Sequence, residues 1–204
     1  MKIFGVGLSK TGTSSLTKAL KILGYKNSIH NPSEWLHLDD QKELIFDFDQ
    51  LDGMDSATDI EIAYYFKELD KRYPGSKFIL TTRGIDGWLR SCENHFNDQL
   101  SSSDAERVLH KALYGSSVFN TKIFRSAYTN HVNEVASYFR GREDDLLVLP
   151  IESEKKMALL ADFLGIDGNI HRYPIANRAF PLPIWLKSRL RRYPVLMKLR
   201  NQFR

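Results

Sequence analysis

The first 25 residues constrain the fold of this chain more than any other stretch. Residues 2–6 form a short apolar run that is typical of a buried strand. A turn rich in glycine and hydroxyl residues follows, Gly7-Leu8-Ser9-Lys10-Thr11-Gly12-Thr13-Ser14, and then apolar residues at helical spacing, Leu16, Ala19, Leu20 and Leu23. A strand, a glycine turn and a helix in this order direct backbone N–H groups to one point, and that geometry binds phosphate.

The position of its lysine distinguishes this turn from the common nucleoside-triphosphate loop. The spacing from Gly7 to Gly12 fits the first part of the Walker A pattern, in which a lysine directly follows the second glycine. Thr13 has that position here, and the lysine of the turn is Lys10. The positive charge would therefore meet a different part of a bound ligand.

A second motif ends in an arginine. Residues 77–82 are β-branched and apolar, Arg83 follows them, and a helical pattern begins near Trp88. Arg83 is therefore expected at the carboxyl end of a strand, where open α/β sheets bind their ligands. Ser91 lies eight residues later. A guanidinium binds phosphate oxygens in a bidentate manner, and a hydroxyl adds one more donor.

These two motifs resemble those of the sulfotransferase family, whose enzymes use 3'-phosphoadenosine 5'-phosphosulfate (PAPS). The family loop reads Lys-x-Gly-Thr-(Ser/Thr), which residues 10–14 match. The resemblance implies that Lys10 contacts the oxygen bridging sulfuryl group and phosphate, and that Arg83 and Ser91 bind the 3'-phosphate. It also implies a set of residues that hold the 5'-phosphate: Thr11, Gly12, Thr13, Ser14 and Ser15.

A third region resembles the C-terminal signature of the same family. It comprises residues 160–165, then Tyr173 and Pro174, and then Asn177 and Arg178. In the family the loop after this helix closes over the nucleotide. The resemblance therefore implies that Arg178 contacts the bound nucleotide.

Strand and helix signals alternate along the chain. Strand patterns recur at residues 3–6, 44–48, 78–82 and 146–149, and one of the helical patterns between them covers residues 58–73. This alternation predicts an α/β fold with a mostly parallel sheet flanked by helices. The resemblance adds the P-loop-like sulfotransferase architecture, which we expect over residues 1–184.

Residues 185–204 form a basic amphipathic tail. The tail carries seven positive charges and no acid, whereas the whole chain has a net charge of +4, so the remainder is negative. Such a segment can lie on an anionic membrane surface or dock on a partner. The alternative, which we favour, is that its apolar side packs on the same domain. The chain shows no recognised nucleic-acid-binding module.

Composition agrees with one compact enzyme domain. A chain of 204 residues with 42% hydrophobic residues can bury a substantial core without disulfides or metals. The single cysteine, Cys92, excludes an internal disulfide. The N-terminal apolar run is too short for a signal peptide, and no run approaches the ~18 apolar residues of a membrane-spanning helix. We expect a cytoplasmic protein, with peripheral membrane contact of the tail left open.

The resemblance implies transfer of a sulfuryl group from PAPS to a hydroxyl or amine of a small-molecule or glycan acceptor, leaving 3',5'-ADP. Lys10 would stabilise the charge that builds on the leaving phosphate, and no metal is required. The acceptor needs a general base, for which Asp59 is the first candidate and Asp55 the second. Either aspartate could instead cap the next helix. His95 and His30 are further candidates.

Two other functions remain open at this point. A P-loop kinase or NTPase is favoured by Asp47, which ends the strand pattern at residues 44–48 and could hold Mg²⁺, but the threonine at position 13 argues against it. A non-catalytic nucleotide-binding scaffold with a membrane- or partner-binding tail is the other alternative. Mg²⁺-dependent ATP hydrolysis would identify the first, and PAPS binding without turnover the second.

Overall fold

A computed structural model describes residues 1–96, 103–167 and 172–176 of the chain. The chain divides into two units, Met1–Pro174 and Ile175–Arg204. Arg178 and the basic tail at residues 185–204 lie outside the described residues. What was expected of them remains a prediction.

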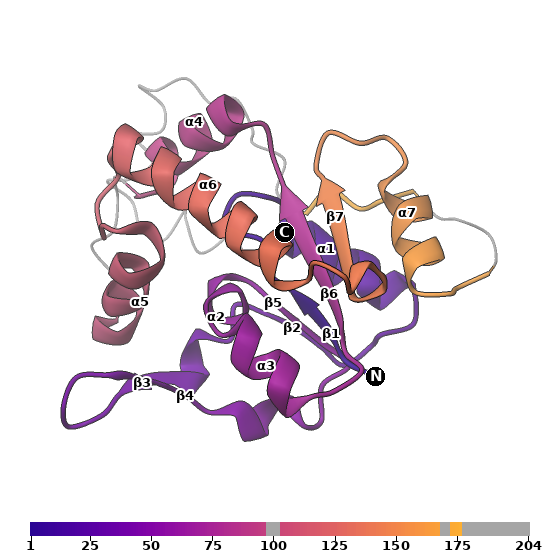
Figure 1. Cartoon of the computed structure of the whole chain (residues 1–204), viewed down its shortest axis with the longest axis horizontal. Helices are drawn as coiled ribbons and strands as arrows, with labels where there is room; N and C mark the ends of the chain where they lie inside the picture. Colours follow the sequence, from indigo (N-terminus) through magenta and orange to yellow (C-terminus); the bar gives the residue numbers. More distant parts are fainter. Residues whose placement is uncertain (97–102, 168–171, 177–204) are drawn as a thin grey trace, which may run out of the picture. The chain divides into compact units, whose positions relative to one another are not determined.

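A five-stranded sheet forms the centre of the first unit, and all its strands run parallel (Figure 1). The strands stand in the order β2, β5, β1, β6, β7, with bounds β1 Ile3–Gly5, β2 Ser28–His30, β5 Ser56–Thr58, β6 Lys77–Thr82 and β7 Leu146–Pro150. β1 is the middle strand, and its Ile3 stands opposite Ser56 on one side and Lys77 on the other. The predicted α/β fold with a mostly parallel sheet is confirmed.

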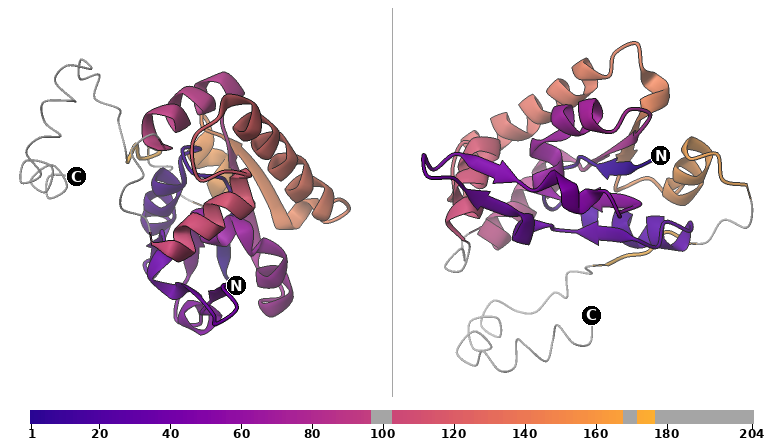
Figure 2. Two further views of the ribbon diagram at one scale, coloured as in Figure 1. Left: turned by 90° about the vertical axis from the view of Figure 1, so that its left-hand side faces the viewer. Right: turned by 90° about the horizontal axis from the view of Figure 1, so that it is seen from below.

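Helices cover both faces of this sheet (Figures 1 and 2). α1 (Thr13–Ile22) and α7 (Lys156–Phe163) pack on one face. The other face carries α2, α3 and α6, and α4 and α5 pack on α6, with bounds α2 Ile60–Tyr64, α3 Phe66–Arg72, α4 Ile85–Phe96, α5 Asp104–Tyr114 and α6 Thr121–Tyr138.

The pleat of the central strands sorts their side chains between two apolar clusters. Ile3 and Ile79 join the cluster with α1 and α7, whereas the neighbouring Phe4 and Phe78 join the cluster on the opposite face. All four are essentially without exposed surface. This alternation fixes the register of β1 and β6, because a slip of one residue would move every side chain to the wrong face.

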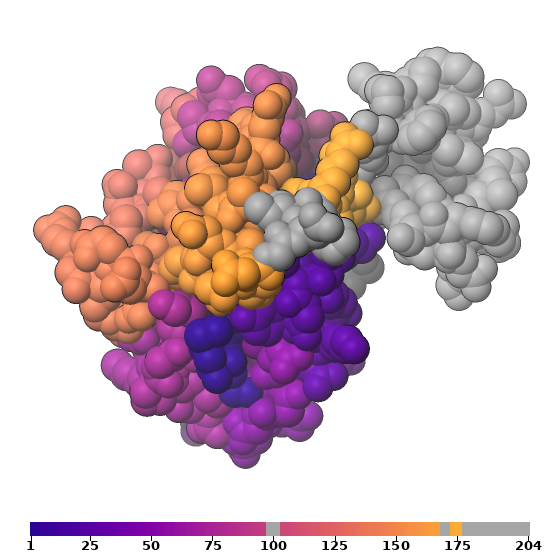
Figure 3. Space-filling model, turned by 90° about the vertical axis from the view of Figure 1, so that its right-hand side faces the viewer, coloured from indigo at the N-terminus to yellow at the C-terminus, as the bar shows by residue number. Residues whose placement is uncertain are grey.

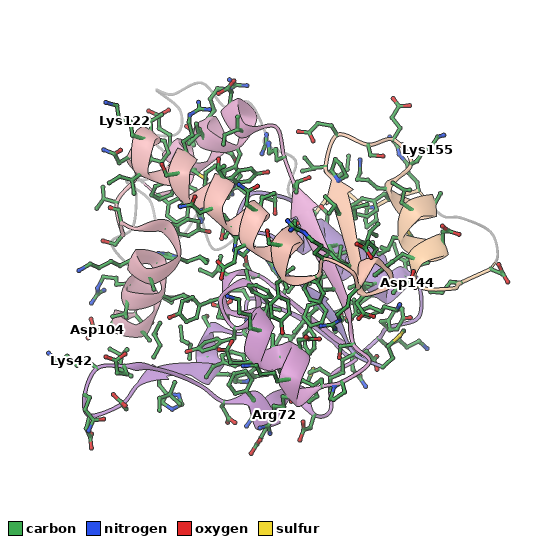
Figure 4. All side chains as sticks on the ribbon, viewed as in Figure 1. Lys42, Arg72, Asp104, Lys122, Asp144 and Lys155 are labelled. Carbon is green, nitrogen blue, oxygen red and sulfur yellow. The ribbon has the colours of Figure 1, made fainter. Side chains whose placement is uncertain are left out.

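The apolar run at residues 44–48 does not join the parallel sheet as predicted. It forms β4 (Leu44–Phe46), which pairs antiparallel with β3 (Leu36–Leu38) in a separate hairpin. Lys42 lies at the tip of this hairpin (Figure 4), with a φ of +63° that closes the turn. The apolar side of this run packs on Tyr65 through Phe46, and the two rings are stacked. Local apolarity therefore predicted a strand but not its partner.

The helix predicted over residues 58–73 is divided. Thr58 belongs to β5, α2 begins at Ile60, and a break near Tyr65 separates α2 from α3. The buried side of the pattern is nevertheless correct, since Ile62, Phe66 and Leu69 are all buried. β2 and β5 were not predicted, because each is three residues long and contains serine or threonine.

α7 begins at Lys156, and Ser153 Oγ, just before it, accepts a hydrogen bond from the Lys155 amide at 3.2 Å. On α6, Val135 is buried, whereas the next residue, Ala136, is exposed. The described chain also contains 3₁₀ turns at Ser33–Trp35, Phe48–Leu51 and Glu143–Asp145.

The chain enters the centre of the sheet almost at once. Figure 3 shows the N-terminal residues in indigo at the surface, below the orange segment that includes α7. Met1 is 66% exposed, but Ile3 is already fully buried. Of the helices in the described ranges, none is long and apolar enough to cross a membrane.

Gly7 stands where the chain leaves β1 and passes close to β6. A Cβ at this position would lie 2.0 Å from Thr81 Oγ1 and 2.7 Å from the Thr81 carbonyl oxygen. We therefore expect Gly7→Ala to lower the free energy of unfolding by about 1–3 kcal/mol, as overpacked sites do. Urea unfolding followed by circular dichroism measures this change. Gly53→Ala is the control, since nothing lies within 4 Å of its Cβ position, and equal losses in both variants would contradict the prediction.

Candidate active site

The glycine turn joins β1 to α1 at the carboxyl edge of the sheet. Gly12 stands at the N-cap of α1 with a φ of +101°, a conformation that side chains rarely adopt. Its carbonyl oxygen accepts hydrogen bonds from the amides of Ser15 and Leu16, both at 3.0 Å. The first amides of a helix lack acceptors of the regular helical pattern, so this turn offers donors to an anion.

Hydroxyl groups tie the turn to the sheet. Thr11 Oγ1 donates to the Leu8 carbonyl oxygen at 2.6 Å and lies 2.7 Å from Thr81 Oγ1, with both threonines buried. The Thr11 amide also donates to the Leu8 carbonyl oxygen, at 3.2 Å. The Thr11 side chain therefore supports the turn from inside.

Two aromatic side chains hold the backbone of Ser9, and sequence reasoning missed this function for both. Trp88 Nε1 donates to the Ser9 carbonyl oxygen at 2.8 Å, and the Ser9 amide donates to Tyr114 Oη at 3.2 Å. Trp88 comes from α4 and Tyr114 from α5, and neither has exposed surface. Sequence gives no signal for such contacts, which join residues 79 and 105 positions apart.

Lys10 and Arg83 converge on one side of the turn. Lys10 has a left-handed backbone with a φ of +69°, and its carbonyl oxygen accepts a hydrogen bond from an Arg83 guanidinium nitrogen at 3.3 Å. Burial raises the pKa of the Cys92 thiol to about 12, and the positive charges of Lys10 and Arg83 act in the opposite direction. Both cations are therefore close enough to Cys92 of α4 for their charges to act on its thiol.

Arg83 is held at the position that the sequence predicted, directly after β6. Its amide donates to Tyr128 Oη at 2.9 Å, and the same hydroxyl donates to its carbonyl oxygen at 2.7 Å. Arg83 Nε lies 3.5 Å from where a Cβ on Gly87 would be, so the guanidinium lies over the first turn of α4. Ser91 is four residues beyond Gly87 and shares its helix face. Gly87, which has no side chain, leaves room for the arginine over this turn.

Asp59 forms the other side of the turn, together with His30. Its carboxylate accepts hydrogen bonds from Ser9 Oγ at 3.4 Å and Thr13 Oγ1 at 3.5 Å. The second carboxylate oxygen lies 3.4 Å from His30 Nε2, which is also 2.7 Å from Ser14 Oγ. This cluster joins the ends of β2 and β5 to the beginning of α1.

The backbone of Asp59 is strained. Its φ is +108° and its ψ −169°, a combination that residues other than glycine rarely adopt. Asp59 stands in the N-cap position of α2, yet its side chain makes no capping hydrogen bond and is directed at the turn instead. The residue with the strained backbone is therefore also the one whose side chain accepts hydrogen bonds from the glycine turn.

The other base candidates stand elsewhere. Asp55 precedes β5 at the amino edge of the sheet, and its carboxylate accepts a hydrogen bond from the Asn27 amide at 2.8 Å. His95 lies in the last turn of α4 with its ring against Phe96. Of the candidates named from sequence, the structure brings Asp59 and His30 to the turn and leaves Asp55 at the opposite edge.

Asp47, the feature that favoured a magnesium nucleotide, has a local role. Its two carboxylate oxygens accept hydrogen bonds from the Asp49 amide at 3.3 Å and from Gln50 Nε2 at 2.9 Å. Asp47 thus caps the 3₁₀ turn after β4, outside the parallel sheet. Within the described ranges there is no group of three or more His, Cys, Asp or Glu residues that could hold a metal ion.

Glu61 is the acid that sequence reasoning missed. Its side chain is fully buried on α2, and neither carboxyl oxygen has a hydrogen-bond partner among the described residues. Burial raises the pKa of the Glu61 carboxyl to about 8, and the charge of Asp59 adds to this effect. An acid two positions after Asp59 in a helical pattern resembles any solvent-facing glutamate, so the sequence carries no sign of its burial.

A groove of about 850 Å³ lies between α2, α3, α5 and α6. Its walls include Tyr65, Lys67, Asn130 and Glu134. Tyr114, which accepts the hydrogen bond from the Ser9 amide, lies under this groove without exposed surface.

Comparisons with known proteins identify relatives of this chain. A family model described as a sulfotransferase domain matches residues 2–180. The curated relative "Ava biosynthesis cluster protein M" of Aspergillus versicolor is 38% identical over 111 residues, a match that covers 46% of this chain and 42% of the relative. The match thus spans less than half of that protein.

Two solved structures share the fold. The mouse sulfotransferase SULT7A1 complexed with PAP is 18% identical, with a TM-score of 0.51 over 82% of this chain and 59% of that one. A sulfotransferase from Alicyclobacillus acidocaldarius is 17% identical, with a TM-score of 0.52 over 93% of this chain and 89% of that one. At such identities the likeness concerns the fold.

The raised pKa of Glu61 predicts a pH dependence of stability. An ordinary glutamate releases its proton near pH 4.5, whereas the folded protein keeps the proton of Glu61 to about pH 8. Between these values the folded state binds the extra proton, so the free energy of unfolding falls as pH rises, by up to about 1.4 kcal/mol per pH unit. Glu61→Gln should flatten this slope in urea unfolding from pH 5 to 9. Glu68→Gln, an exposed acid on α3, should retain the slope; a slope equally steep in Glu61→Gln would contradict the prediction.

Proposed function

Because this chain belongs to the sulfotransferase domain family, we propose that it transfers a sulfuryl group from PAPS to a hydroxyl or amine of a small acceptor. The proposal is carried by one observation. Lys10 and Arg83 converge on one side of an anion-binding turn, and Asp59 stands on the other. The mouse relative is complexed with PAP, and we infer that the same nucleotide, 3',5'-ADP, is the product here.

The turn offers separate contacts for the two phosphate groups of PAPS. We assign the 5'-phosphosulfate to the start of α1, with the amides of residues 11–15 and the hydroxyls of Thr13 and Ser14 around it. We assign the 3'-phosphate to Arg83, whose guanidinium lies over the first turn of α4, and to Ser91, which stands on the same face of that helix as Gly87. A guanidinium gives such a phosphate a bidentate, permanently charged partner.

Lys10 is the residue that we assign to the leaving group. In the transfer, the bond between sulfur and the bridging oxygen breaks while a bond forms in line from the acceptor oxygen to sulfur. Negative charge builds on the bridging oxygen, and a fixed cation and amide donors stabilise it. The left-handed backbone of Lys10 and its link to Arg83 restrict where this cation can lie. No metal is needed in this scheme.

Asp59 is the general base of this proposal. It would accept the proton from the acceptor hydroxyl as the oxygen attacks, and His30 beside it can share the resulting charge. Asp59 is 9% exposed, so a bound acceptor would reach it with little competing water. Its strained backbone holds the carboxylate toward the turn.

The nature of the acceptor beyond this class stays a proposal. Small molecules and glycans with a free hydroxyl are the acceptors that we would test first. Cytoplasmic location and contact of residues 185–204 with a membrane remain predictions from sequence.

Arg83 provides the first test of the donor site. Calorimetric titration should show clear preference for 3',5'-ADP over 5'-AMP, because only the former carries the phosphate that Arg83 would bind. Arg83→Ala should abolish the preference, at a loss of about 2–5 kcal/mol as for a truncated buried charge contact. Arg140→Ala, an exposed arginine after α6, should bind as the wild type does. Equal, weak binding of both nucleotides to the wild type would reject the PAPS site.

Asp59 provides the test of the chemical step. With PAPS and the best acceptor from a panel of alcohols, phenols, sugars and amines, Asp59→Asn should lower kcat by about 10²–10⁴-fold, as the loss of a general base does. Its affinity for 3',5'-ADP should not fall, because the charge that the substitution removes from beside the turn is negative. Asp55→Asn, at the other edge of the sheet, is the matched control and should keep its kcat. The assignment would be wrong if the two variants had the same kcat.

A further inference from the structure

Glu61 is an unusual group for the interior of a protein. It has no exposed surface, and neither carboxyl oxygen has a partner within the described part of the chain. An unpaired buried polar group costs stability, and an unpaired buried charge costs far more. A group kept at such a cost is a candidate for a function.

Glu61 lies close in sequence to the proposed base. It is in the first turn of α2, two residues after Asp59. This turn begins directly after the carboxyl end of β5, which ends at Thr58. Asp59 in turn accepts hydrogen bonds from Ser9 and Thr13 of the anion-binding turn. Asp59 thus links the segment that carries Glu61 to that turn.

The charged groups around Glu61 leave it without a cationic partner in the described part of the chain. α2 packs on β1, β5, α3 and α5, and β1 and β5 carry no titratable side chain. The titratable residues of the two helices are Lys67, Glu68, Asp70, Lys71 and Arg72 on α3 and Asp104, Glu106, Arg107, His110, Lys111 and Tyr114 on α5. The side chains that act on the Glu61 carboxyl are Asp59 and Glu106, both acids. His30 lies beyond Asp59.

We propose that Glu61 is a positioning residue for sulfuryl transfer. Its carboxyl group keeps a proton beside Asp59 and so limits the acceptor side of the turn to one negative charge. This inference rests on the proposed function above. With Glu61 uncharged, the anionic donor meets one carboxyl group fewer that can repel it on this side of the turn. The raised pKa of Glu61, about 8, agrees with this state at neutral pH.

Loss of the Glu61 proton would weaken binding of the donor. A second buried negative charge would repel the phosphates of the donor. At a separation of the order of 10 Å in a partly buried site, the repulsion corresponds to roughly a tenfold loss of nucleotide affinity. We therefore expect the site to weaken above about pH 8, in a step that depends on Glu61.

The test compares the wild type with Glu61→Gln, which keeps the shape of the side chain and cannot ionise. Calorimetric affinity for 3',5'-ADP is measured from about pH 7.5 to about pH 9.5, where the phosphates of the nucleotide are already ionised. The wild type should lose about tenfold in affinity across this range beyond the loss in Glu61→Gln. Glu61→Leu is a second uncharged variant in case the amide disturbs folding, and Glu68→Gln, an exposed acid, should follow the wild type.

A second readout does not depend on the nucleotide. The ring-proton resonances of His30, assigned with His30→Gln, should show an inflection near pH 8 in the wild type that is absent from Glu61→Gln. Superimposable affinity profiles and superimposable His30 resonance profiles in the two proteins would overturn the inference. If neither protein binds 3',5'-ADP at any pH, the proposed function fails, and the His30 resonances still show whether Glu61 loses a proton near pH 8.

Discussion

The position of the Ser9 backbone determines where the rest of the site lies. Trp88 and Tyr114 hold its two polar groups from α4 and α5, so three elements far apart in sequence meet at one residue. Ser9 lies next to Lys10, whose left-handed backbone directs the chain back toward α1. Because both aromatic side chains are fully buried, the loop is built on the core of the molecule. An anion-binding turn held in this way needs little reorganisation on ligand binding.

The site is electrostatically divided. Arg83 and Lys10 are on the side of α4, whereas Asp59, Glu61 and the neighbouring Glu106 are on the side of α2 and α5. A donor with two phosphate groups suits the first side, and removal of a proton from an acceptor suits the second. While Glu61 keeps its proton, the second side does not add another negative charge that would repel a donor bound on the first side. Burial and the neighbouring acids favour the uncharged form of the Glu61 carboxyl. An uncharged carboxyl costs less to bury than a charged one, even without a cationic partner among the described residues.

Sequence patterns predicted the parts of this structure that depend on neighbours along the chain. The glycine turn after β1 and Arg83 after β6 follow from short apolar runs that end in turn residues, and both are where those runs placed them. The contact of His30 with Asp59 joins two strands of three residues each, too short and polar to give a strand signal. The burial of Glu61 depends on α5 packing over α2, which no local pattern contains. The prediction that residues 44–48 join the parallel sheet was wrong for the same reason. Their apolar run specified a strand but not the strand with which it pairs, which is β3.

The geometry at position 13 bears on the choice between a PAPS site and a triphosphate site. Thr13 is 4% exposed, and its hydroxyl donates to Asp59. A lysine in this position would meet the Asp59 carboxylate and form an ion pair there, so that its charge would be lost to a triphosphate. The chain instead carries its loop lysine three residues earlier, on the side of Arg83, and Asp47 is engaged in capping a turn outside the parallel sheet. Cation and carboxylate are thus kept on opposite sides of the loop, as transfer between an anionic donor and a hydroxyl acceptor requires.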